Sequence, residues 1–510
     1  KGLNYRTSVP SNSTYVPPVQ TINVPEKLEF ESILLSSKEE LFKVIGSIPK
    51  EAIVAFDTET TDIDVQKAKI VGYSFSFEED KAYYVPISHF YLGVPEQLSK
   101  EDALEGIRRL NEHKLVLQNF KYDYDVIKFN FDYELKLFAD TMILSWLINP
   151  SSKVGLDFVS DLYFNHKMIA FKDIVKKGEN FSNIDLEKAC EYAAEDAYIT
   201  RKLYFRLLEE LKAQDCENLL DIANKYEFDF TYVLSSMQNS GIKVDVEFLK
   251  VLKQKNSEFL SSLTNTIYTL CDTEFNINSP KQLGEVLFDK IGLKPPKKTK
   301  TGYSTNEAVL QKLINEHEVI SKLLEYREAF KLQSTYIEPL LELGVKNDDN
   351  RVHTSFLQTG TATGRLSSKN PNLQNIPVKS EAGREIRKAF ISSEGYTLVG
   401  VDYSQIELRL LAHFSKDTAL LEAFREGLDI HTQTAVKIFG EEEASEKRNV
   451  AKSINFGLLY GMGSRKLGET LGIPAKEAKV YIESYFEAFS TVKGYLKSIE
   501  DDVLESGSID

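Results

Sequence analysis

Over residues 31–205 the chain alternates short apolar runs with longer segments of helical periodicity. The runs at 52–56 and 70–75 are short and rich in branched and aromatic residues, which predicts strands. The segments 100–110 and 186–208 repeat apolar residues about every three to four positions, which predicts amphipathic helices. Strands that alternate with helices in this way are typical of an α/β domain.

The pattern changes near residue 206. Long helical periods dominate residues 206–350. They lie at 226–237, 248–270 and 319–343. Residues 351–510 are mixed, with strand-like runs at 352–357 and 396–402 followed by helical periodicity to the end. Residues 1–30 are rich in Pro, Ser and Asn and predict a linker.

Length and composition fit a multidomain globular protein. The 510 residues, 42% of them hydrophobic and 27% charged, suggest about three domains. The three cysteines form no disulfide framework, which favours a reducing cytosol; they are Cys190, Cys216 and Cys271. No apolar run approaches the roughly 20 residues of a membrane span, and no signal peptide is evident. The chain lacks a starting Met and ends on a helical pattern, so we expect both ends to be cuts in a longer protein.

The formal net charge of −15 argues against nucleic-acid binding, but the basic residues are clustered. Residues 447–466 contain five Lys or Arg and no acid, and residues 360–391 contain six Lys or Arg against two Glu. A loop at 294–300 is also lysine-rich and could either contact phosphates or be a solvated lysine run. Such basic segments are a better indicator of nucleic-acid binding than the overall charge.

The first candidate site begins with two acids at the end of a predicted strand. Asp57 and Glu59 are two residues apart, so their side chains leave the same face. Two carboxylates on one face repel each other unless a cation lies between them, and Mg²⁺ prefers such oxygen ligands. The alternative is a polar strand end with solvated acids.

Two further segments add to this pair. Asp123 follows a predicted strand at 114–117, and Tyr192 and Asp196 lie four residues apart on one face of a predicted helix. Glu195 is expected to face elsewhere as a surface acid. Several carboxylates are needed to hold two metal ions about 4 Å apart, which together clamp the attacking and leaving oxygens of a phosphodiester.

The ordered set DxE, NxxYD and YxxxD resembles the proofreading 3′→5′ exonuclease domain with four acids and one tyrosine. The resemblance implies four metal ligands, Asp57, Glu59, Asp123 and Asp196. It also implies that Tyr192 positions the attacking water and that Asn119 and Tyr122 contact the DNA strand.

A second candidate site lies on a predicted helix that repeats every four residues. Its members are Arg448, Lys452, Phe456 and Tyr460, which span roughly 120° of one face over about 18 Å. Cations suit a triphosphate, and aromatic rings suit a stacked base. An ordinary amphipathic helix with Arg and Lys at its surface is the alternative.

A third candidate site follows the apolar run at 397–401, which reads as the end of a buried strand. Asp402 comes directly after it, and Ser404 and Glu407 match a capping box. Both acids therefore have a structural interpretation as residues near a helix N-terminus. Taken alone, the structural and functional interpretations are equally good.

The longer motifs decide between them. DYSQIELR at 402–409, the RxxxKxxNFGxxYG pattern from Arg448, TGRLSS at 363–368 and PNLQNIP at 371–377 resemble motifs of family A DNA polymerases of the bacterial polymerase I type. The resemblance covers about residues 31–510. It implies an RNase H-like α/β exonuclease domain at 31–205. An α+β polymerase domain of right-hand architecture follows, with a helical thumb at 206–350 and incomplete palm and fingers at 351–510.

The resemblance also implies roles for the matching residues. Asp402 would bind metal and the Tyr403 carbonyl would support it, while Glu407 would select deoxynucleotides. The incoming nucleotide would be bound by Arg448, Lys452, Phe456 and His431, with Tyr460 at the template position. The primer-template minor groove would be contacted by Arg365, Asn372 and Gln374, for which a polar turn cluster is the alternative.

These expectations define a function. We expect template-directed DNA synthesis with 3′→5′ proofreading in replication and repair, using two Mg²⁺ ions per active site with Mn²⁺ as a substitute. The expected partners are primer-template DNA, single-stranded 3′ ends and dNTPs, bound by a monomer in the bacterial cytoplasm near the nucleoid, with no membrane. Because the family's second palm acid, in a C-terminal His-Asp-Glu segment, has no counterpart here, we expect these 510 residues to show exonuclease activity only.

Two alternatives remain. A stand-alone 3′→5′ exonuclease acting on RNA would share the first site, but it leaves residues 360–465 unexplained. A non-catalytic DNA-binding protein would have no need of the complete set of exonuclease acids.

Overall fold

The computed structural model describes residues 28–296, 298–299, 302–378 and 380–506. The chain divides into two compact units, with the boundary between Leu398 and Val399. Most of the expected linker at 1–30 lies outside the described residues, as does Lys297 in the lysine-rich loop. The two units are described separately below.

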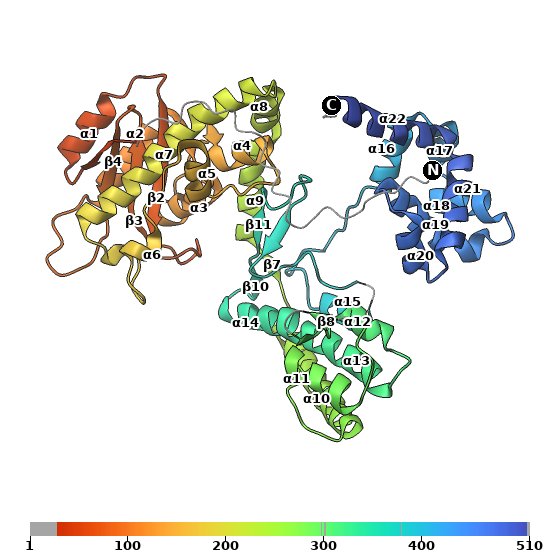
Figure 1. The fold of residues 1–510 in the computed structure, drawn as a ribbon. Coiled ribbons are helices and arrows are strands. Elements are labelled where there is room, and N and C mark those ends of the chain that lie inside the picture. The colour runs from red at the N-terminus through yellow and green to blue at the C-terminus, as the bar shows by residue number, and fades with distance from the viewer. Residues whose placement is uncertain (1–27, 297, 300–301, 379, 507–510) are drawn as a thin grey trace. The chain divides into compact units, whose positions relative to one another are not determined.

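The first unit contains a six-stranded sheet in the order β1-β4-β3-β2-β5-β6 (Figure 1). Strand β3 is antiparallel to its neighbours β2 and β4, and the remaining pairs are parallel. The strands are β1 (Glu31–Leu34), β2 (Ile53–Thr60), β3 (Ile70–Ser76), β4 (Lys81–Pro86), β5 (Lys114–Leu117) and β6 (Ala139–Asp140). The strands predicted at 52–56 and 70–75 are confirmed.

Helices cover both faces of this sheet. Helices α1, α2 and α3 pack on one face, and α4, α5 and the long α7 pack on the other (Figure 1). Their bounds, with the short α6, are α1 (Lys38–Gly46), α2 (Lys100–Leu110), α3 (Phe120–Phe131), α4 (Thr141–Ile148), α5 (Leu156–Phe164), α6 (Phe171–Ile174) and α7 (Leu186–Ala213). Phe56, Tyr73 and Phe75 pack with α1–α3, whereas Val71, which lies where the register between β2 and β3 shifts, packs with α7. The expected α/β domain is therefore a three-layer sandwich.

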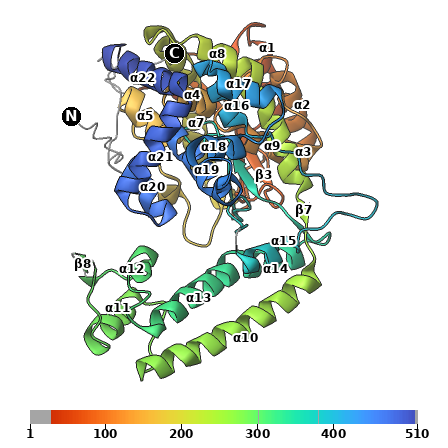
Figure 2. The same ribbon diagram turned by 90° about the vertical axis from the view of Figure 1, so that its right-hand side faces the viewer.

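The predicted helical region follows. It consists of α8 (Asn218–Ile222), α9 (Phe228–Ser240), α10 (Val246–Cys271), α11 (Pro280–Gly284), α12 (Glu307–Lys312), α13 (Glu318–Leu332) and α14 (Glu338–Lys346). Helices α10 and α13 lie side by side (Figure 2), and a core that includes Ile267, Leu287 and Leu323 joins them to α11 and α12. The predicted helical segment 319–343 is interrupted by a wider turn at Gln333–Ile337, which separates α13 from α14.

The remainder of the first unit is a set of short strand pairs and one helix. The elements are β7 (Ile242–Lys243), β8 (Lys298–Thr299), β9 (Gly302–Tyr303), β10 (Arg351–Val352), β11 (Ser355–Leu357), β12 (Ser367–Lys369) and α15 (Glu381–Arg387). The strand predicted at 352–357 is thus two strands: β10 pairs with β7, and β11 forms a hairpin with β12.

The prediction of a strand at 396–402 is wrong. These residues are irregular, and Leu398, Val399 and Val401 are 57%, 76% and 91% exposed. A strand needs a neighbour to pair its backbone N–H and C=O groups. Among the described residues no strand pairs with this segment, so its apolar pattern is not matched by a sheet.

The second unit is helical in its described part. Its helices are α16 (Ile406–Ser415), α17 (Thr418–Arg425), α18 (Ile430–Phe439), α19 (Ala444–Leu459), α20 (Ser464–Leu471), α21 (Ala475–Ala488) and α22 (Ser490–Ser506). They enclose a core that includes Leu408, Leu420, Ile454 and Tyr485. None of the described helices combines the length and apolar character required to span a bilayer.

Candidate active site

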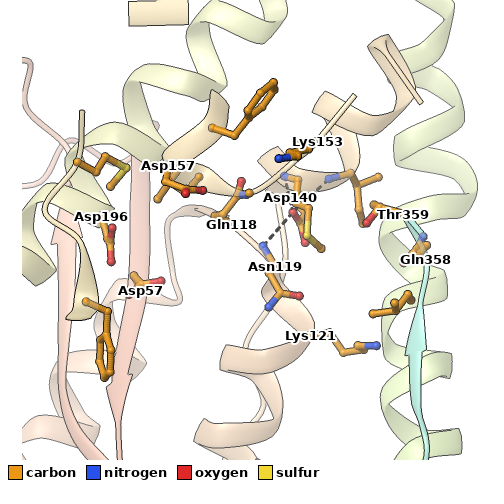
Figure 3. Close-up of a pocket in the computed structure, with 18 of the residues that line it drawn as sticks. Asp57, Gln118, Asn119, Lys121, Asp140, Lys153, Asp157, Asp196, Gln358 and Thr359 are labelled. Carbon is orange, nitrogen blue, oxygen red and sulfur yellow. Dashed lines mark hydrogen bonds between the residues drawn. The ribbon is translucent and has the colours of Figure 1, made fainter. Parts of the chain in front are cut away.

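Three of the predicted acids meet on one face of the sheet. Strand β2 carries Asp57 and Glu59 on the face that α7 covers, and α7 brings Asp196 over them. One carboxylate oxygen from each of the three lies within 4.8 Å of the others. Figure 3 shows Asp57 and Asp196 facing each other across this space. Asp57 and Glu59 therefore share one face of β2, as their spacing in the sequence predicted.

The electrostatics of the cluster favour the binding of a cation. Burial raises the pKa of Asp57 to about 7. Burial, followed by the charges of Asp57 and Asp196, raises the pKa of Glu59 well above its usual value. Glu59 is 7% exposed, and its Oε1 is buried without a hydrogen-bond partner, which is uncommon for a buried oxygen. The donor set, three oxygens of hard carboxylates with one left open, fits Mg²⁺ or Mn²⁺.

Asp123 lies beside this cluster rather than in it. It stands in the first turn of α3, where its carboxylate accepts hydrogen bonds from the backbone N (3.1 Å) and Oγ1 (2.6 Å) of Thr58. Burial, followed by the charge of Asp57, raises the pKa of Asp123. The fourth acid is thus close enough to Asp57 for their charges to interact, although it is not among the three clustered ligands.

Tyr192 is held against aromatic neighbours one helical turn before Asp196. Its ring centroid lies 5.8 Å from that of Phe181 and 6.3 Å from that of Phe171. Burial, followed by the charge of Asp196, raises the pKa of Tyr192, so its hydroxyl keeps its proton at physiological pH. A protonated, oriented hydroxyl can direct a water molecule toward a reacting phosphate.

The acids open into a pocket of about 1000 Å³. Asp57, Tyr192 and Asp196 line it together with Asn119, and residues 356–359 from β11 onward line it as well. Figure 3 shows the two acids on one side and Gln358 and Thr359 on the other. Four lysines also line the pocket: Lys121, Lys153, Lys167 and Lys369. Such a combination of cations and acids suits a polyanionic strand that ends at the acids.

The two predicted strand contacts on α3 differ. Asn119 is exposed and lines the pocket, with its backbone in the left-handed region (φ 67°). Tyr122 is half-buried, and its hydroxyl donates to the Asp62 carbonyl at 2.7 Å and also bonds Thr60.

The second unit brings together another set of predicted residues. Arg448, Lys452 and Phe456 lie on α19, and Tyr460 follows its last residue. The predicted helix is confirmed. Arg448 forms an ion pair with Asp429, the residue that caps α18. The Tyr460 hydroxyl donates to Glu407, 53 residues away in the sequence, so the third candidate site meets the second.

His431 lies under this helix rather than at its surface. It is 3% exposed, and its ring centroid lies 5.6 Å from that of Phe456. The side-chain nitrogen of Asn455 lies 3.1 Å from His431 Nδ1, and burial lowers the pKa of the ring. The neutral imidazole thus supports Phe456 through packing and Asn455 through a hydrogen bond.

Comparison with known proteins gives the family. The sequence profile of DNA polymerase family A matches residues 246–510, and a profile described as a 3′-5′ exonuclease matches residues 33–212. The chain belongs to DNA polymerase family A.

Its relatives include bacterial proteins named DNA polymerase I. The chain is 41% identical over 486 residues to a DNA polymerase I of Borreliella burgdorferi, which covers 94% of this chain and 52% of the relative. It is 40% identical over 481 residues to that of Pseudomonas aeruginosa, which covers 91% and 52%. The chain thus spans about half the length of these relatives.

A solved polymerase structure has a similar fold. The POL domain of Pol1 from M. smegmatis, in complex with DNA primer-template and dNTP, matches with a TM-score of 0.76 and 30% identity. The match covers 93% of this chain and 79% of that one.

The prediction that Glu195 is a surface acid is wrong. Glu195 is 5% exposed and accepts hydrogen bonds from His166 Nε2 (2.9 Å) and the Ile169 backbone N (2.7 Å). The helix α7 is covered on this side by α5 and the segment that follows it, so a position off the sheet face is not solvent-exposed. Glu195 thereby fixes residues 165–170, several of which line the pocket.

Asp140 is a site residue that the sequence analysis missed. Its buried carboxylate accepts hydrogen bonds from the backbone N of Asn119 (3.2 Å), Phe120 (2.9 Å) and Met142 (2.8 Å). Figure 3 shows Asp140 beside Asn119. It therefore fixes the starts of both α3 and α4, and with them Asn119. An Asp directly before an apolar helical run is an N-cap signal that could have revealed it.

The capping box expected at Ser404 does not form. Helix α16 begins at Ile406, and the preceding Gln405 adopts a left-handed conformation (φ 53°) that places no side-chain cap on the helix. Glu407 instead lies in the first turn and accepts from Tyr460. Asp402 and Tyr403 are exposed in the irregular segment before the helix. Within the described part of the chain, Asp402 belongs to no group of three clustered ligands.

The predicted minor-groove residues lie on and after the β11–β12 hairpin in the first unit. Arg365, Asn372 and Gln374 are all exposed. Asn372 Oδ1 accepts hydrogen bonds from the Gln374 backbone N (3.1 Å) and Ser368 Oγ (3.2 Å). Asn372 therefore also shapes the turn, as the polar-turn alternative supposed.

Proposed function

We propose that the pocket of the first unit removes nucleotides from the 3′ ends of single-stranded DNA. The observation that carries this proposal is the cluster of Asp57, Glu59 and Asp196, with one orphan buried oxygen, at the wall of a lysine-lined pocket. Three acids that share one space are ligands for a divalent cation, and the lysines complement the phosphates of a strand.

In this proposal each side chain has a defined task. Asp57, Glu59 and Asp196 hold one divalent cation, and Asp123, next to Asp57, contributes to a second. Bound cations of this kind polarise the phosphate and make a water molecule acidic enough to attack it. The protonated Tyr192 hydroxyl orients that water, as its position one turn before Asp196 allows.

The pocket wall would orient the strand. Asn119 is exposed at the start of α3, where Asp140 fixes it, and it contacts the terminal nucleotides. Lys153, Lys167 and Lys369 line the pocket and would contact the phosphates, whereas Lys121 is engaged by Gln238 and the Phe356 carbonyl. Tyr122 positions the first residues of α3 through Asp62.

We further propose that the whole protein performs template-directed DNA synthesis in replication and repair, as a monomer in the bacterial cytoplasm. The second unit supports this through α19, where Arg448 and Lys452 would bind the triphosphate of a dNTP and Phe456 would pack on its base. Glu407 and Tyr460, joined by a hydrogen bond, would select the sugar and guard the template position.

The remaining polymerase residues complete this proposal. Asp402 would bind Mg²⁺, with the Tyr403 carbonyl beside it, and His431 would support the nucleotide from below α19. The primer-template would pass over the exposed residues Arg365, Asn372 and Gln374.

One assay tests both activities of the 510-residue chain. A 3′-recessed primer-template, labelled at the primer 5′ end, is incubated with Mg²⁺ and all four dNTPs. Because Asp402 lies in an exposed irregular segment, we expect the primer to be shortened and not extended. A primer that remains unchanged contradicts the proposed exonuclease, and an extended primer contradicts our account of Asp402.

A further inference from the structure

The residue opposite Glu59 on the neighbouring strand is a glycine, which has no side chain. Strand β2 pairs Glu59 with Gly72 on β3, and residues directly opposed in an antiparallel pair share a face. A Cβ at Gly72 would overlap the hydroxyl of Tyr84, which lies on β4. The space next to Glu59 is thus filled by the Tyr84 hydroxyl, and the charge of Glu59 adds to burial in raising the pKa of Tyr84.

The Tyr84 hydroxyl is committed to a buried histidine. Its oxygen lies 2.7 Å from Nε2 of His89, and His89 Nδ1 lies 3.1 Å from the carbonyl oxygen of Ile184. A carbonyl can only accept, so Nδ1 carries the ring proton. Burial lowers the pKa of His89 to about 4, which makes the ring neutral at physiological pH. Nε2 is therefore an acceptor, and Tyr84 donates its only proton to it.

This arrangement has a consequence for Glu59. A buried carboxylate oxygen ordinarily finds a donor, and the neighbouring Tyr84 hydroxyl would be one, yet Glu59 Oε1 has no partner. We propose that His89 withholds the Tyr84 proton from Glu59 and thereby keeps Glu59 Oε1 open for a divalent cation. His89 and Tyr84 are then positioning residues for the cation site, and this inference rests on the proposed function of that site.

The effect of His89 on packing has to be distinguished from its effect on the Tyr84 proton. The His89 ring centroid lies 5.8 Å from that of Phe181, which in turn lies 5.8 Å from that of Tyr192. Loss of the ring could therefore disturb Tyr192 through the aromatic cluster alone. The two roles differ in what happens when the Tyr84 hydroxyl is removed as well.

A double-variant series measures the difference. Mn²⁺ binding to the full chain is measured by calorimetry for the parent protein, His89→Leu, Tyr84→Phe and the double variant. His89→Leu frees the Tyr84 proton for Glu59, so Mn²⁺ affinity should fall, on the order of the 10- to 100-fold by which changes in the hydrogen bonding of metal ligands alter affinity. Tyr84→Phe alone removes a hydroxyl that in the parent donates to His89 and not to Glu59, so the affinity should stay close to that of the parent. The double variant should return close to the Tyr84→Phe value.

Other outcomes contradict the inference at different levels. A double variant as weak as His89→Leu assigns the loss to packing, and an unaltered His89→Leu protein removes the proton role altogether. A parent chain that binds no Mn²⁺ overturns the proposed cation site itself, and the inference with it.

A second measurement needs no variant at His89. The spectrum of the ¹⁵N-histidine-labelled parent protein should contain a neutral ring protonated at Nδ1 that changes on Tyr84→Phe. The opposite tautomer would make Tyr84 an acceptor and overturn the inference, even if His89→Leu does not fold.

Discussion

The acids of the first unit and Asp402 of the second follow similar local sequence patterns but have different surroundings. Asp57 and Glu59 stand on the middle of a paired sheet, under α7, where burial raises the pKa of both. Asp402 follows an equally apolar run, but that run is irregular and Val401 is 91% exposed. An acid becomes a strong cation ligand when the fold buries it among other acids, because the cost of their charges is then relieved by the cation.

The largest expected effect is the loss of Asp57. Asp57→Ala removes a ligand from the three-acid cluster, and cation stabilisation is worth several kcal/mol, so hydrolysis of single-stranded DNA should slow by about 1,000-fold or more. Asp402→Ala, at the exposed position, should leave this rate within about twofold. Rates are compared on a 5′-labelled oligonucleotide. Equal losses of hydrolysis rate in the two variants would contradict the proposed difference between the two sites.

The next effect concerns the Tyr192 hydroxyl. Tyr192→Phe keeps the ring against Phe181 and Phe171 but removes the group that orients water, so the turnover number should fall by about 100-fold with little change in KM. The matched control is Tyr198→Phe on the same helix, whose ring stacks on Phe30 away from the pocket lining. A fall in stability instead of turnover would assign Tyr192 a packing role.

The pH dependence of cation binding sharpens the comparison. The pKa of Asp57 is raised to about 7, above the value of about 4 for an unfolded Asp, so this group holds its proton more tightly in the folded state. The stabilisation that this bound proton gives the folded state is therefore complete below about pH 4 and is lost as pH rises toward 7. A bound cation relieves this loss. Mg²⁺ should raise Tm by several degrees at pH 8 and by much less at pH 5.5.

Variants provide the control for this pH effect. Asp57→Asn should reduce the Mg²⁺-dependent gain at pH 8, whereas Asp402→Asn should behave as the parent chain does. A Mg²⁺ shift in Tm that is equal at both pH values would contradict the raised pKa as its source.

A smaller effect is expected at Glu195. Glu195→Ala leaves the Ile169 backbone N and His166 without their acceptor, which should cost about 1–3 kcal/mol of unfolding free energy. Because residues 165–170 line the pocket, KM for single-stranded DNA should also rise. Glu191→Ala, one turn earlier on the same helix and exposed, is the control and should change neither quantity. Urea unfolding and steady-state kinetics provide the two values.

The smallest effect on stability is expected at Arg448. Its ion pair with Asp429 is partly exposed, so Arg448→Ala should change the free energy of unfolding by less than about 1 kcal/mol. Binding of a dNTP should nevertheless weaken, because Arg448 is proposed to hold the triphosphate. Lys476→Ala, on α21, serves as the control for nonspecific charge loss. Unchanged nucleotide affinity in Arg448→Ala would remove it from the proposed binding site.

The sequence predicted what depends on local pattern. Alternation on β2 placed Asp57 and Glu59 on one face, and the four-residue spacing of Tyr192 and Asp196 placed both on one face of α7. It did not predict what depends on neighbours distant in the sequence. Glu195 is buried because α5 and the segment after it cover α7, and the run at 396–402 is no strand because none of the described strands pairs with it.

The capping box at Ser404 failed for a related reason. The motif specifies side chains that suit a helix start, but the left-handed backbone of Gln405 moved the start of α16 to Ile406. Asp140 shows the reverse case: an ordinary N-cap signal marks a carboxylate that fixes two helices and Asn119 at once, because β6 ends beside the start of α3.

The central claim is that the three acids of the first unit form a cation-dependent exonuclease site. Its most direct test is a 5′-labelled single-stranded oligodeoxynucleotide incubated with the chain and Mg²⁺, resolved at single-nucleotide length, with Asp57→Ala in parallel. We predict stepwise shortening from the 3′ end that EDTA and Asp57→Ala both abolish. An oligonucleotide that stays intact in Mg²⁺ and in Mn²⁺, or that Asp57→Ala shortens equally fast, would contradict the claim.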